Sequence, residues 1–230
     1  FSKQKMNTNN EPELDKNNSG SKTKITLKNI IKSFSGITVL NDINLEFTSG
    51  EIHGLVGQNG AGKSTLGKII GGHYKLSSGK IFLNDNLIKK WSSKIALDNG
   101  IAMIHQELAL VPDMTVYDNI FLGIEENYYG IIGKQNTKLF NDLDQKIGFN
   151  LDPNQKVSSL RIADQQKVEI IRALARNARV IIMDEPTSSL TNDEVIKLHD
   201  LMHKLKKSGY LIIYVSHFLD AIIEVCDKIS

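Results

Sequence analysis

A glycine-rich run near residue 60 combines residue types that could bind phosphate groups. In chain order it reads Gly57, Gln58, Asn59, Gly60, Ala61, Gly62, Lys63 and Ser64, with Thr65 next. Glycines let the backbone curl so that its N–H groups point at phosphate oxygens, and a following helix directs its positive end at the same anion. The ammonium of Lys63 can then contact the β- and γ-phosphates, and the hydroxyl of Ser64 can contact Mg²⁺. The run therefore predicts a site for ATP with Mg²⁺.

The alternative is a glycine-rich turn that carries a lysine by chance. Average residue usage puts such a match at about 1 in 100 chains of this length. The flanking residues also favour phosphate binding, because residues 51–56 have the pattern of a strand and residues 62–71 that of a helix. A loop between a strand and a helix is the setting that the binding mechanism requires.

A second group of candidate residues ends an apolar run. Residues 180–183 are all large and apolar, and Asp184 and Glu185 follow directly. Charged groups at the end of a central strand are costly unless they have partners or a function. Beside a nucleotide, we expect Asp184 to hold Mg²⁺ through its water shell and Glu185 to polarise the attacking water as a general base. The alternative is a strand end that simply reaches solvent, and it would be preferred without the glycine-rich run.

The elements that would position these residues alternate between strands and helices. Apolar and polar residues alternate in the first half-buried strands, at 25–30 and 43–47, and further strands are expected near Ile81 and Ile101. In the second half we expect helices at 163–175, at 192–208 and from Phe218, with apolar strands at 180–183 and 210–215. Uniformly apolar strands with helices between them indicate a parallel sheet covered on both faces.

Between residues 107 and about 160, short helical segments replace the strands. Helices are expected at 115–122 and 135–147, and Pro112 and Pro153 suit their boundaries. We interpret residues 107–165, approximately, as an inserted helical subdomain.

The two ends of the chain differ in composition. Residues 1–23 are rich in Asn, Lys, Glu and Ser, and we expect a disordered tail or the remnant of a tag. Residues 24–230 are expected to form the folded domain, cut short within a strand that starts near Lys228.

Composition narrows the class of protein. With 230 residues, of which 40% are apolar and 23% charged, the chain can bury a sizeable core. Its net charge of +2 and its lack of a long basic run do not indicate a nucleic-acid partner. The single cysteine, Cys226, cannot form an internal disulfide, which fits a reducing compartment. The longest apolar stretch, 211–215, is far shorter than the roughly 20 residues of a membrane span, so we expect any membrane role to come through a partner.

Further residues complete an order of motifs that a known family shares. Between the glycine-rich run and the acidic pair lie Ile104, His105, Gln106 and Glu107; after the pair come Pro186 and Thr187, then Ser216 and His217. From about Ile25 to the end, this order resembles an ABC-transporter nucleotide-binding domain. The resemblance implies an α/β fold: a P-loop NTPase core with a mainly parallel sheet, an N-terminal antiparallel β-subdomain and the inserted helical subdomain.

The resemblance also implies roles for three residues. Phe34 lies where the family uses an aromatic ring to stack on adenine, although a core phenylalanine is the alternative. Gln106 matches the glutamine that touches Mg²⁺ and the reactive water and moves with the membrane partner. His217 matches the switch histidine that contacts the γ-phosphate. The implied catalytic residues are thus Glu185, His217, Gln106 and Lys63, and those at the metal are Ser64, Gln106 and Asp184.

Other segments resemble one branch of the family. Residues 105–112, 115–116, 119–123 and 187–191 look like the ATPases of importers for ribose, galactose and similar monosaccharides. Such ATPases usually carry two halves in one chain, and this chain resembles the first half. The implied partners are a second ABC ATPase domain, in the same longer chain or as a dimer, transmembrane permease subunits and, indirectly, an extracytoplasmic solute-binding protein. The implied location is peripheral, on the cytoplasmic face of the inner membrane. Nucleosides are an alternative cargo.

The family's signature loop departs from its ideal form, Leu-Ser-Gly-Gly-Gln. It falls on Leu160, Arg161, Ile162, Ala163 and Asp164. In the family this loop closes over ATP held by the partner domain, where a small hydroxyl and bare N–H groups approach the γ-phosphate. Arg161 replaces the serine, Ala163 a glycine and Asp164 the glutamine. We therefore expect the composite site that uses this loop to have reduced activity.

Two other classes of function stay open. A soluble ABC protein that acts on nucleic acid or ribosomes would require basic patches or a long charged insertion, and the sequence has neither. A nucleotide-binding regulatory domain with little catalysis is favoured by the altered signature and opposed by the intact Glu185 and His217.

Two further features are interpreted as structural. His199 and His203 lie one helical turn apart, a spacing that can bind zinc, but no third ligand is evident. We place both on the polar side of their helix, whose buried face would carry Val195, Leu198, Leu201, Met202 and Leu205. Trp91 is interpreted as a packing residue.

Overall fold

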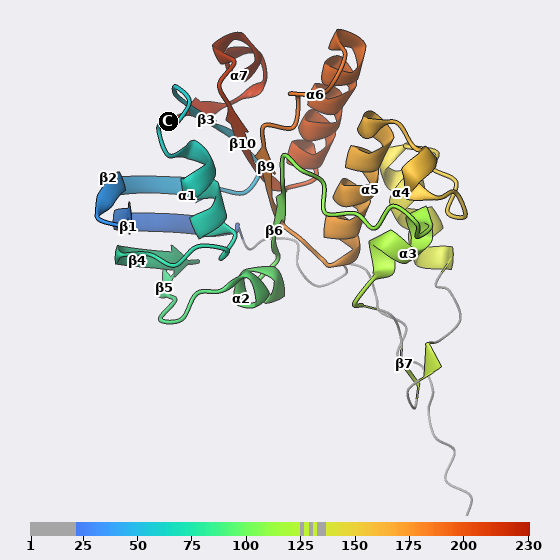
Figure 1. Ribbon diagram of the computed structural model, residues 1–230, viewed down its shortest axis with the longest axis horizontal. Helices are drawn as coiled ribbons and strands as arrows, with labels where there is room; N and C mark the ends of the chain where they lie inside the picture. Colours follow the sequence, from blue (N-terminus) through green and yellow to red (C-terminus); the bar gives the residue numbers. More distant parts are fainter. Residues whose placement is uncertain (1–21, 125–126, 129–130, 133–136) are drawn as a thin grey trace, which may run out of the picture.

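The computed structural model describes residues 22–124, 127–128, 131–132 and 137–230. At its centre is a five-stranded parallel sheet in the order β11-β3-β10-β9-β6 (Figure 1). The strands are β3 (Ile52–Val56), β6 (Ile101–Ile104), β9 (Val180–Asp184), β10 (Leu211–Ser216) and β11 (Lys228–Ile229). Because the pairs are all parallel, the carboxyl ends of the strands meet at one edge of the sheet, where ligands of open α/β sheets bind.

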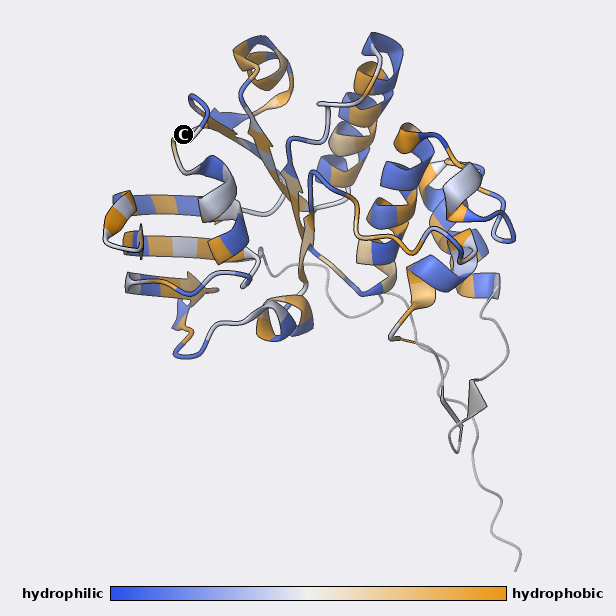
Figure 2. Ribbon diagram, viewed as in Figure 1, coloured by the Kyte–Doolittle hydropathy of each residue, from blue (hydrophilic) through white to orange (hydrophobic). Residues whose placement is uncertain are grey.

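The central strands send alternate side chains into two hydrophobic cores. From β9, Val180 and Ile182 enter one core, whereas Ile181 and Met183 enter the other. The first core lies beneath α1 (Lys63–Ile70), and the second beneath α5 (Ile162–Ala175), α6 (Asn192–Lys207) and α7 (Leu219–Val225). Burial on both faces explains why β9 and β10 are largely apolar up to their last residues, as their colour in Figure 2 shows. The predicted parallel sheet is confirmed.

An antiparallel sheet packs on the α1 side of the molecule (Figure 1). Its order is β2-β1-β4-β5, formed by β1 (Lys24–Phe34), β2 (Ile37–Thr48), β4 (Ser78–Leu83) and β5 (Asn86–Leu87). Ile25 and Leu27 of β1 are buried, while Lys28 is exposed, which is the alternation of a sheet with one covered face. The expected strands at 25–30 and 43–47 are confirmed, and both extend further than predicted.

A group of helices lies on the opposite side of the central sheet. Both α3 (Val116–Phe121) and α4 (Thr137–Ile147) pack against α5, and Tyr117, Phe121 and Phe140 form their aromatic contacts. The two predicted helices are thus present, although residues 135–136 lie outside the described residues. The pair of two-residue strands β7 (Asn127–Tyr128) and β8 (Ile131–Ile132) was not predicted. Residues 1–21 of the predicted tail also lie outside the described part of the chain.

Within the ranges that the structure describes, no helix combines the length and the apolar character needed to span a membrane.

Trp91 stabilises the end of α1. Its Nε1 donates to the carbonyl oxygens of Ile69 and Ile70, at 2.8 and 3.1 Å, and the indole packs on the first core. These carbonyls belong to the last turn of the helix and have no partner within it. Trp91 is therefore a packing residue, as predicted, and in addition caps α1. The next helix, α2 (Ser93–Asp98), was not predicted from the sequence, although its N-cap Ser92 accepts a hydrogen bond from the Ile95 N–H.

The predicted position of His199 is wrong. Its side chain is 7% exposed and lies edge-on to Tyr214 of β10, with ring centroids 6.0 Å apart. The buried stripe of α6 is wider than the periodicity indicated and includes His199 beside Leu198, because the helix covers the sheet face on which Tyr214 lies. Burial lowers the pKa of His199, and its Nε2 has no hydrogen-bond partner among the residues that the structure describes. Val195, predicted to be buried, is partly exposed.

Candidate active site

The glycine-rich run forms the loop between β3 and α1. Gly60 and Gly62 have φ angles of +83° and +94°, in the left-handed region that favours glycine. Gly62 is also tightly packed, because an added Cβ would lie 2.6 Å from Cδ2 of Leu40 in β2. The loop is therefore fixed against the antiparallel sheet just before α1 begins at Lys63.

Lys63 folds back over this loop. Its Nζ donates to the carbonyl oxygen of Gly57 at 2.7 Å and to that of Gln58 at 3.0 Å. Gln58 also accepts from the N–H of Ala61, which closes the turn. The arrangement holds a positive charge above the loop, beside the N-terminus of α1, and both features favour an anion at this place.

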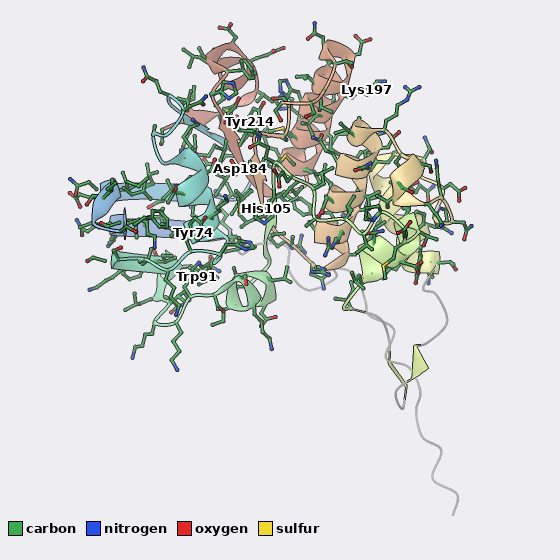
Figure 3. The ribbon with its side chains drawn as sticks, in the orientation of Figure 1. Tyr74, Trp91, His105, Asp184, Lys197 and Tyr214 are labelled. Carbon is green, nitrogen blue, oxygen red and sulfur yellow. The ribbon has the colours of Figure 1, made fainter. Side chains whose placement is uncertain are left out.

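The next residue, Ser64, joins the loop to the central sheet. Its Oγ donates a hydrogen bond of 2.7 Å to Oδ1 of Asp184, the last residue of β9. Asp184 is 4% exposed, and Figure 3 shows it near the centre of the molecule. A hydroxyl and a carboxylate are ligands that Mg²⁺ prefers, directly or through water, so these two residues fit that ion.

Glu185 and His217 lie together where β9 and β10 end. Nδ1 of His217 is 3.1 Å from Oε1 of Glu185. The backbone of Glu185 is left-handed, with φ of +47°, and its N–H donates to the carbonyl of Val215. A non-glycine residue in this conformation costs about 1–3 kcal/mol, and such strain is found at functional sites. Here it coincides with a carboxylate directed toward a histidine on the neighbouring strand.

Lys63, Ser64 and Glu185 line one cleft of about 340 Å³, and Asp184 and His217 are joined to it through their hydrogen bonds to Ser64 and Glu185. Its described lining is Val39, Asn59, Gly60, Gly62, Lys63, Ser64, Thr65, Gln106 and Glu185. Gln106, which follows β6, is thus brought beside Lys63 and Glu185. The structure therefore gathers residues from three separate segments of the chain around the glycine-rich loop.

Several predicted residues lie outside the lining of this cleft: Gly57, Gln58 and Ala61 of the loop, Asp184 and His217 behind Ser64 and Glu185, and two further groups, Phe34 and the segment 160–164. Phe34, at the end of β1, is 39% exposed and is not a core residue. The segment 160–164 lies at the start of α5, where Ile162 is 48% exposed and Asp164 is paired with Lys167 at 2.5 Å. An exposed helix start is a surface that a partner can reach, whereas it cannot act on the cleft of the same chain.

A family model described as ABC transporter matches residues 40–188. The chain belongs to the ABC transporter family. The match includes the glycine-rich loop, Gln106 and the acidic pair.

Two relatives indicate which branch of the ABC transporter family this domain is similar to. It is 45% identical over 200 residues to the arabinose import ATP-binding protein of Paraburkholderia xenovorans, covering 86% of this chain and 39% of that protein. It is 43% identical over 208 residues to the ribose import ATP-binding protein of Chromobacterium violaceum, covering 90% and 41%. The chain thus spans about two fifths of the length of these relatives. The predicted resemblance to simple-sugar importers is confirmed.

The fold of the domain matches a solved ATP-binding cassette that is dimeric and bound to ADP and Pi in a post-hydrolysis state. The TM-score is 0.75 at 26% identity, over 89% of this chain and 92% of that one. The predicted P-loop NTPase fold is confirmed by this likeness and by the two sheets described above.

Sequence reasoning missed a pair of residues in this ABC transporter domain that holds the segment after Gln106. Glu169 of α5 accepts from the Ala109 N–H at 3.1 Å, and Arg172 donates to the Ala109 carbonyl at 2.9 Å. The two side chains also pair with each other at 3.4 Å. Glu169 is 8% exposed, and burial raises its pKa despite the nearby arginine. The only signal in the sequence is a charged pair on an otherwise apolar helix face.

A second contact joins α5 to the acidic loop. Gln166 donates to the carbonyl of Pro186 at 2.6 Å, and Tyr214 of β10 lies 3.4 Å from the Thr187 hydroxyl. The helix that begins with the signature residues is thus attached both to the loop that carries Glu185 and to the segment that follows Gln106.

Proposed function

We propose that this chain is the ATP-binding and ATP-hydrolysing subunit, or half-subunit, of an ABC importer for a small solute. The observation that carries the proposal is the convergence at one cleft of Lys63, the Ser64–Asp184 pair and the Glu185–His217 pair. These groups are an anion-binding charge, a set of oxygen ligands and a carboxylate with a histidine partner. Together they suit phosphoryl transfer to water.

The residues divide the reaction between them. Glu185 accepts a proton from a water whose oxygen forms a bond to the γ-phosphorus, as the bond from that phosphorus to the bridging oxygen of ADP breaks. His217, whose Nδ1 lies 3.1 Å from Oε1 of Glu185, holds this carboxylate in place. Lys63 and the N–H groups of the loop neutralise the charge on the phosphates. Gln106 lies in the same cleft, where it can orient the water.

The donor set also fits a magnesium ion. Ser64 and Asp184 are already within hydrogen-bond distance of each other, and Gln106 lines the same cleft. When bound, Mg²⁺ would neutralise phosphate charge beside Lys63.

The partners follow from what the chain cannot supply to its own site. The segment 160–164 is exposed and outside the cleft, so we propose that a second ABC ATPase domain receives it. A separate cavity of about 410 Å³ includes His105, next to Gln106, together with His73 and Arg172. We propose that transmembrane permease subunits contact this region, at the cytoplasmic face of the inner membrane, and that a solute-binding protein acts indirectly through them.

The proposed solute is a monosaccharide. The relatives that support it are named for arabinose and ribose import, and their identity of 43–45% extends over most of the described chain. We assign cargo selection to the membrane partners and not to this domain. A nucleoside importer is the alternative, and transport by the complete assembly would separate the two.

Steady-state hydrolysis of MgATP by the purified chain and by Glu185→Gln tests the proposal, after binding of ATP to both has been confirmed. We expect both proteins to bind ATP and the substitution to reduce turnover by about 100-fold or more, as loss of a general base does. Glu46→Gln is the matched control, because Glu46 lies on the antiparallel sheet, forms an ion pair with Lys24 there and is not part of the cleft lining. Failure of the folded wild type to bind ATP would refute the proposed function.

A nucleotide-binding regulatory domain is the second candidate. The observation in its favour is the charge of the signature segment, where Asp164 lies in the first turn of α5. If both proteins bind ATP and neither hydrolyses it at concentrations where the chain dimerises, this second candidate is supported instead.

A further inference from the structure

Phe34 is held by a second aromatic ring, that of Tyr74. The centroids of the two rings are 5.4 Å apart and their planes meet at 75°, an edge-to-face contact. Phe34 ends β1, whereas Tyr74 follows α1 by four residues. Figure 3 shows Tyr74 between α1 and the strands of the antiparallel sheet.

The backbone on either side fixes the position of Tyr74. Its N–H donates to the carbonyl of Lys68 in the last turn of α1. Three residues later, the Ser77 N–H donates to the Ile31 carbonyl at 2.9 Å, and the Ser77 hydroxyl accepts from the Ser33 N–H at 3.0 Å. Tyr74 is therefore anchored to the helix that starts at the phosphate-binding loop and to the strand that carries Phe34.

Phe34 lies at the tip of the hairpin between β1 and β2. It precedes a turn in which Ser35 and Gly36 have φ angles of +47° and +84°, and its partner across the hairpin, Ile37, is 72% exposed. A ring at the tip of a hairpin loses rotational freedom when it is fixed for stacking. Tyr74 is the aromatic contact of this ring among the described residues. Because Tyr74 restricts the ring before a ligand binds, less rotational freedom is lost on binding.

A lysine determines which face of Phe34 is open. Nζ of Lys32 lies over this ring, 4.4 Å from its centroid, and 5.9 Å from the centroid of Tyr74. If Lys32 and Tyr74 lay on opposite faces of Phe34, the ammonium and the tyrosine ring would be much further apart than 5.9 Å. Tyr74 therefore lies at the edge of the Phe34 ring and Lys32 covers one of its faces. Neither residue covers the other face.

We propose that Tyr74 is a positioning residue that orients Phe34 so that its open face stacks on the adenine base of the bound nucleotide. The proposal rests on the proposed function, because it takes the phosphates of that nucleotide to lie at the glycine-rich loop. Tyr74 does not touch the base. Tyr74 acts through Phe34, so it affects only the part of the nucleotide affinity that the adenine base contributes.

The test compares a ligand that has the base with one that lacks it. We would measure dissociation constants of MgADP and of magnesium pyrophosphate by calorimetry for the wild type, Tyr74→Leu, Tyr74→Phe, Phe34→Ala and the double variant Tyr74→Leu/Phe34→Ala. Tyr74→Leu should weaken MgADP about three- to ten-fold, the value of an aromatic pair, and leave pyrophosphate unchanged. Tyr74→Phe keeps the ring and should restore MgADP binding. In the Phe34→Ala background Tyr74→Leu should have no further effect.

Controls separate this role from a general loss of structure. Phe82→Leu removes a partly buried ring from β4 of the same sheet and should leave binding of MgADP as in the wild type. Tyr74→Gln provides a second non-aromatic substitution if Tyr74→Leu does not fold, and unchanged pyrophosphate binding shows that either variant is folded.

Three results would overturn the proposal while leaving ATP binding intact. The first is that Tyr74→Leu and Tyr74→Gln bind MgADP as tightly as the wild type, and the second is that they lose as much affinity for pyrophosphate as for MgADP. The third is that Tyr74→Leu weakens MgADP binding in the Phe34→Ala background as much as it does in the wild type. A wild type that binds neither ligand would instead refute the proposed function, and Phe34→Ala with unchanged MgADP affinity would refute the role of Phe34.

Discussion

The hydroxyl of Ser64 donates a 2.7 Å hydrogen bond to Oδ1 of Asp184, across 120 residues of sequence. This contact joins the first turn of α1 to the carboxyl end of β9, and it places a hydroxyl and a carboxylate oxygen side by side at the glycine-rich loop. Among the described residues this hydroxyl is the hydrogen-bond partner of the buried carboxylate, so its remaining acceptor sites would be open to the Mg²⁺ that we propose and to the water shell of that ion.

Asp184→Asn should therefore remove the magnesium dependence of ATP binding. The amide keeps the shape of the side chain and loses its charge. We expect addition of Mg²⁺ to strengthen ATP binding by the wild type about ten-fold or more, and to have little effect on the variant. Titration of ATP with and without chelator measures both. Asp193→Asn, in the exposed first turn of α6, is the control, and equal stimulation of Asp184→Asn and wild type would contradict the assignment.

The two left-handed glycines of the loop should respond differently to substitution by alanine. A methyl group on Gly60 would meet nothing within 4 Å, so Gly60→Ala carries only the conformational cost, about 1–2 kcal/mol in the free energy of unfolding. On Gly62 the same methyl would lie 2.6 Å from Leu40, so the loop or β2 must move. Gly62→Ala should lose more stability and also bind ATP more weakly. Chemical denaturation and ATP titration of both variants test this, and a similar loss in both would show that packing against Leu40 is unimportant.

Glu169 should make stability depend on pH. Burial raises its pKa in the folded state above the usual 4.5. The folded state thus favours the protonated side chain. The contribution of Glu169 to the free energy of unfolding is fully present below its unfolded-state pKa and is lost as the pH rises through its folded-state pKa. Relative to Glu169→Gln, which does not ionise, the wild type should lose free energy of unfolding as the pH rises above about 4.5.

A second substitution at Glu169 tests the hydrogen bond. Glu169→Gln can still accept from the Ala109 N–H, whereas Glu169→Ala leaves that group and Arg172 without this partner. We expect the alanine variant to be less stable than the glutamine variant by about 1–3 kcal/mol. Denaturation at several pH values, with Glu107→Gln as the exposed control, measures both effects. A constant difference between wild type and Glu169→Gln across the range would contradict the effect of burial.

The sequence predicted the parts of this molecule that depend on local pattern. The loop around Lys63 and the strand that ends at Asp184 can each be recognised from fewer than ten consecutive residues, because backbone curvature and uniform burial impose specific residue types. Contacts that depend on how elements pack were not predicted. Glu169 and Ala109 are 60 residues apart and meet only because α5 crosses the segment after β6.

His199 shows how periodicity fails in the same way. Its hydropathy placed it on the polar side of α6, yet the helix covers a sheet face that carries Tyr214, and an aromatic partner makes burial of an imidazole acceptable. The contact of Phe34 with Tyr74 was missed for a related reason, since the segment between α1 and β4 has no periodic pattern that could place a tyrosine beside the end of β1. Such positions follow from tertiary packing and not from the local sequence.

The last prediction concerns the signature segment. Arg161 is the N-cap of α5 and its side chain makes no capping hydrogen bond, while Asp164 adds a negative charge in the first turn. If this helix start closes over the γ-phosphate of a partner domain, the bulky Arg161 and the Cβ of Ala163 keep backbone N–H groups away from the phosphate. Arg161→Ser/Ala163→Gly should therefore raise ATP turnover per chain by about ten-fold at concentrations where the chain dimerises, since one added anion donor is worth at least this much.

Asp164→Asn separately measures repulsion by the carboxylate. Turnover as a function of chain concentration distinguishes faster hydrolysis from tighter dimerisation, and unchanged turnover in a dimeric double variant would show that these departures are not what limits the site.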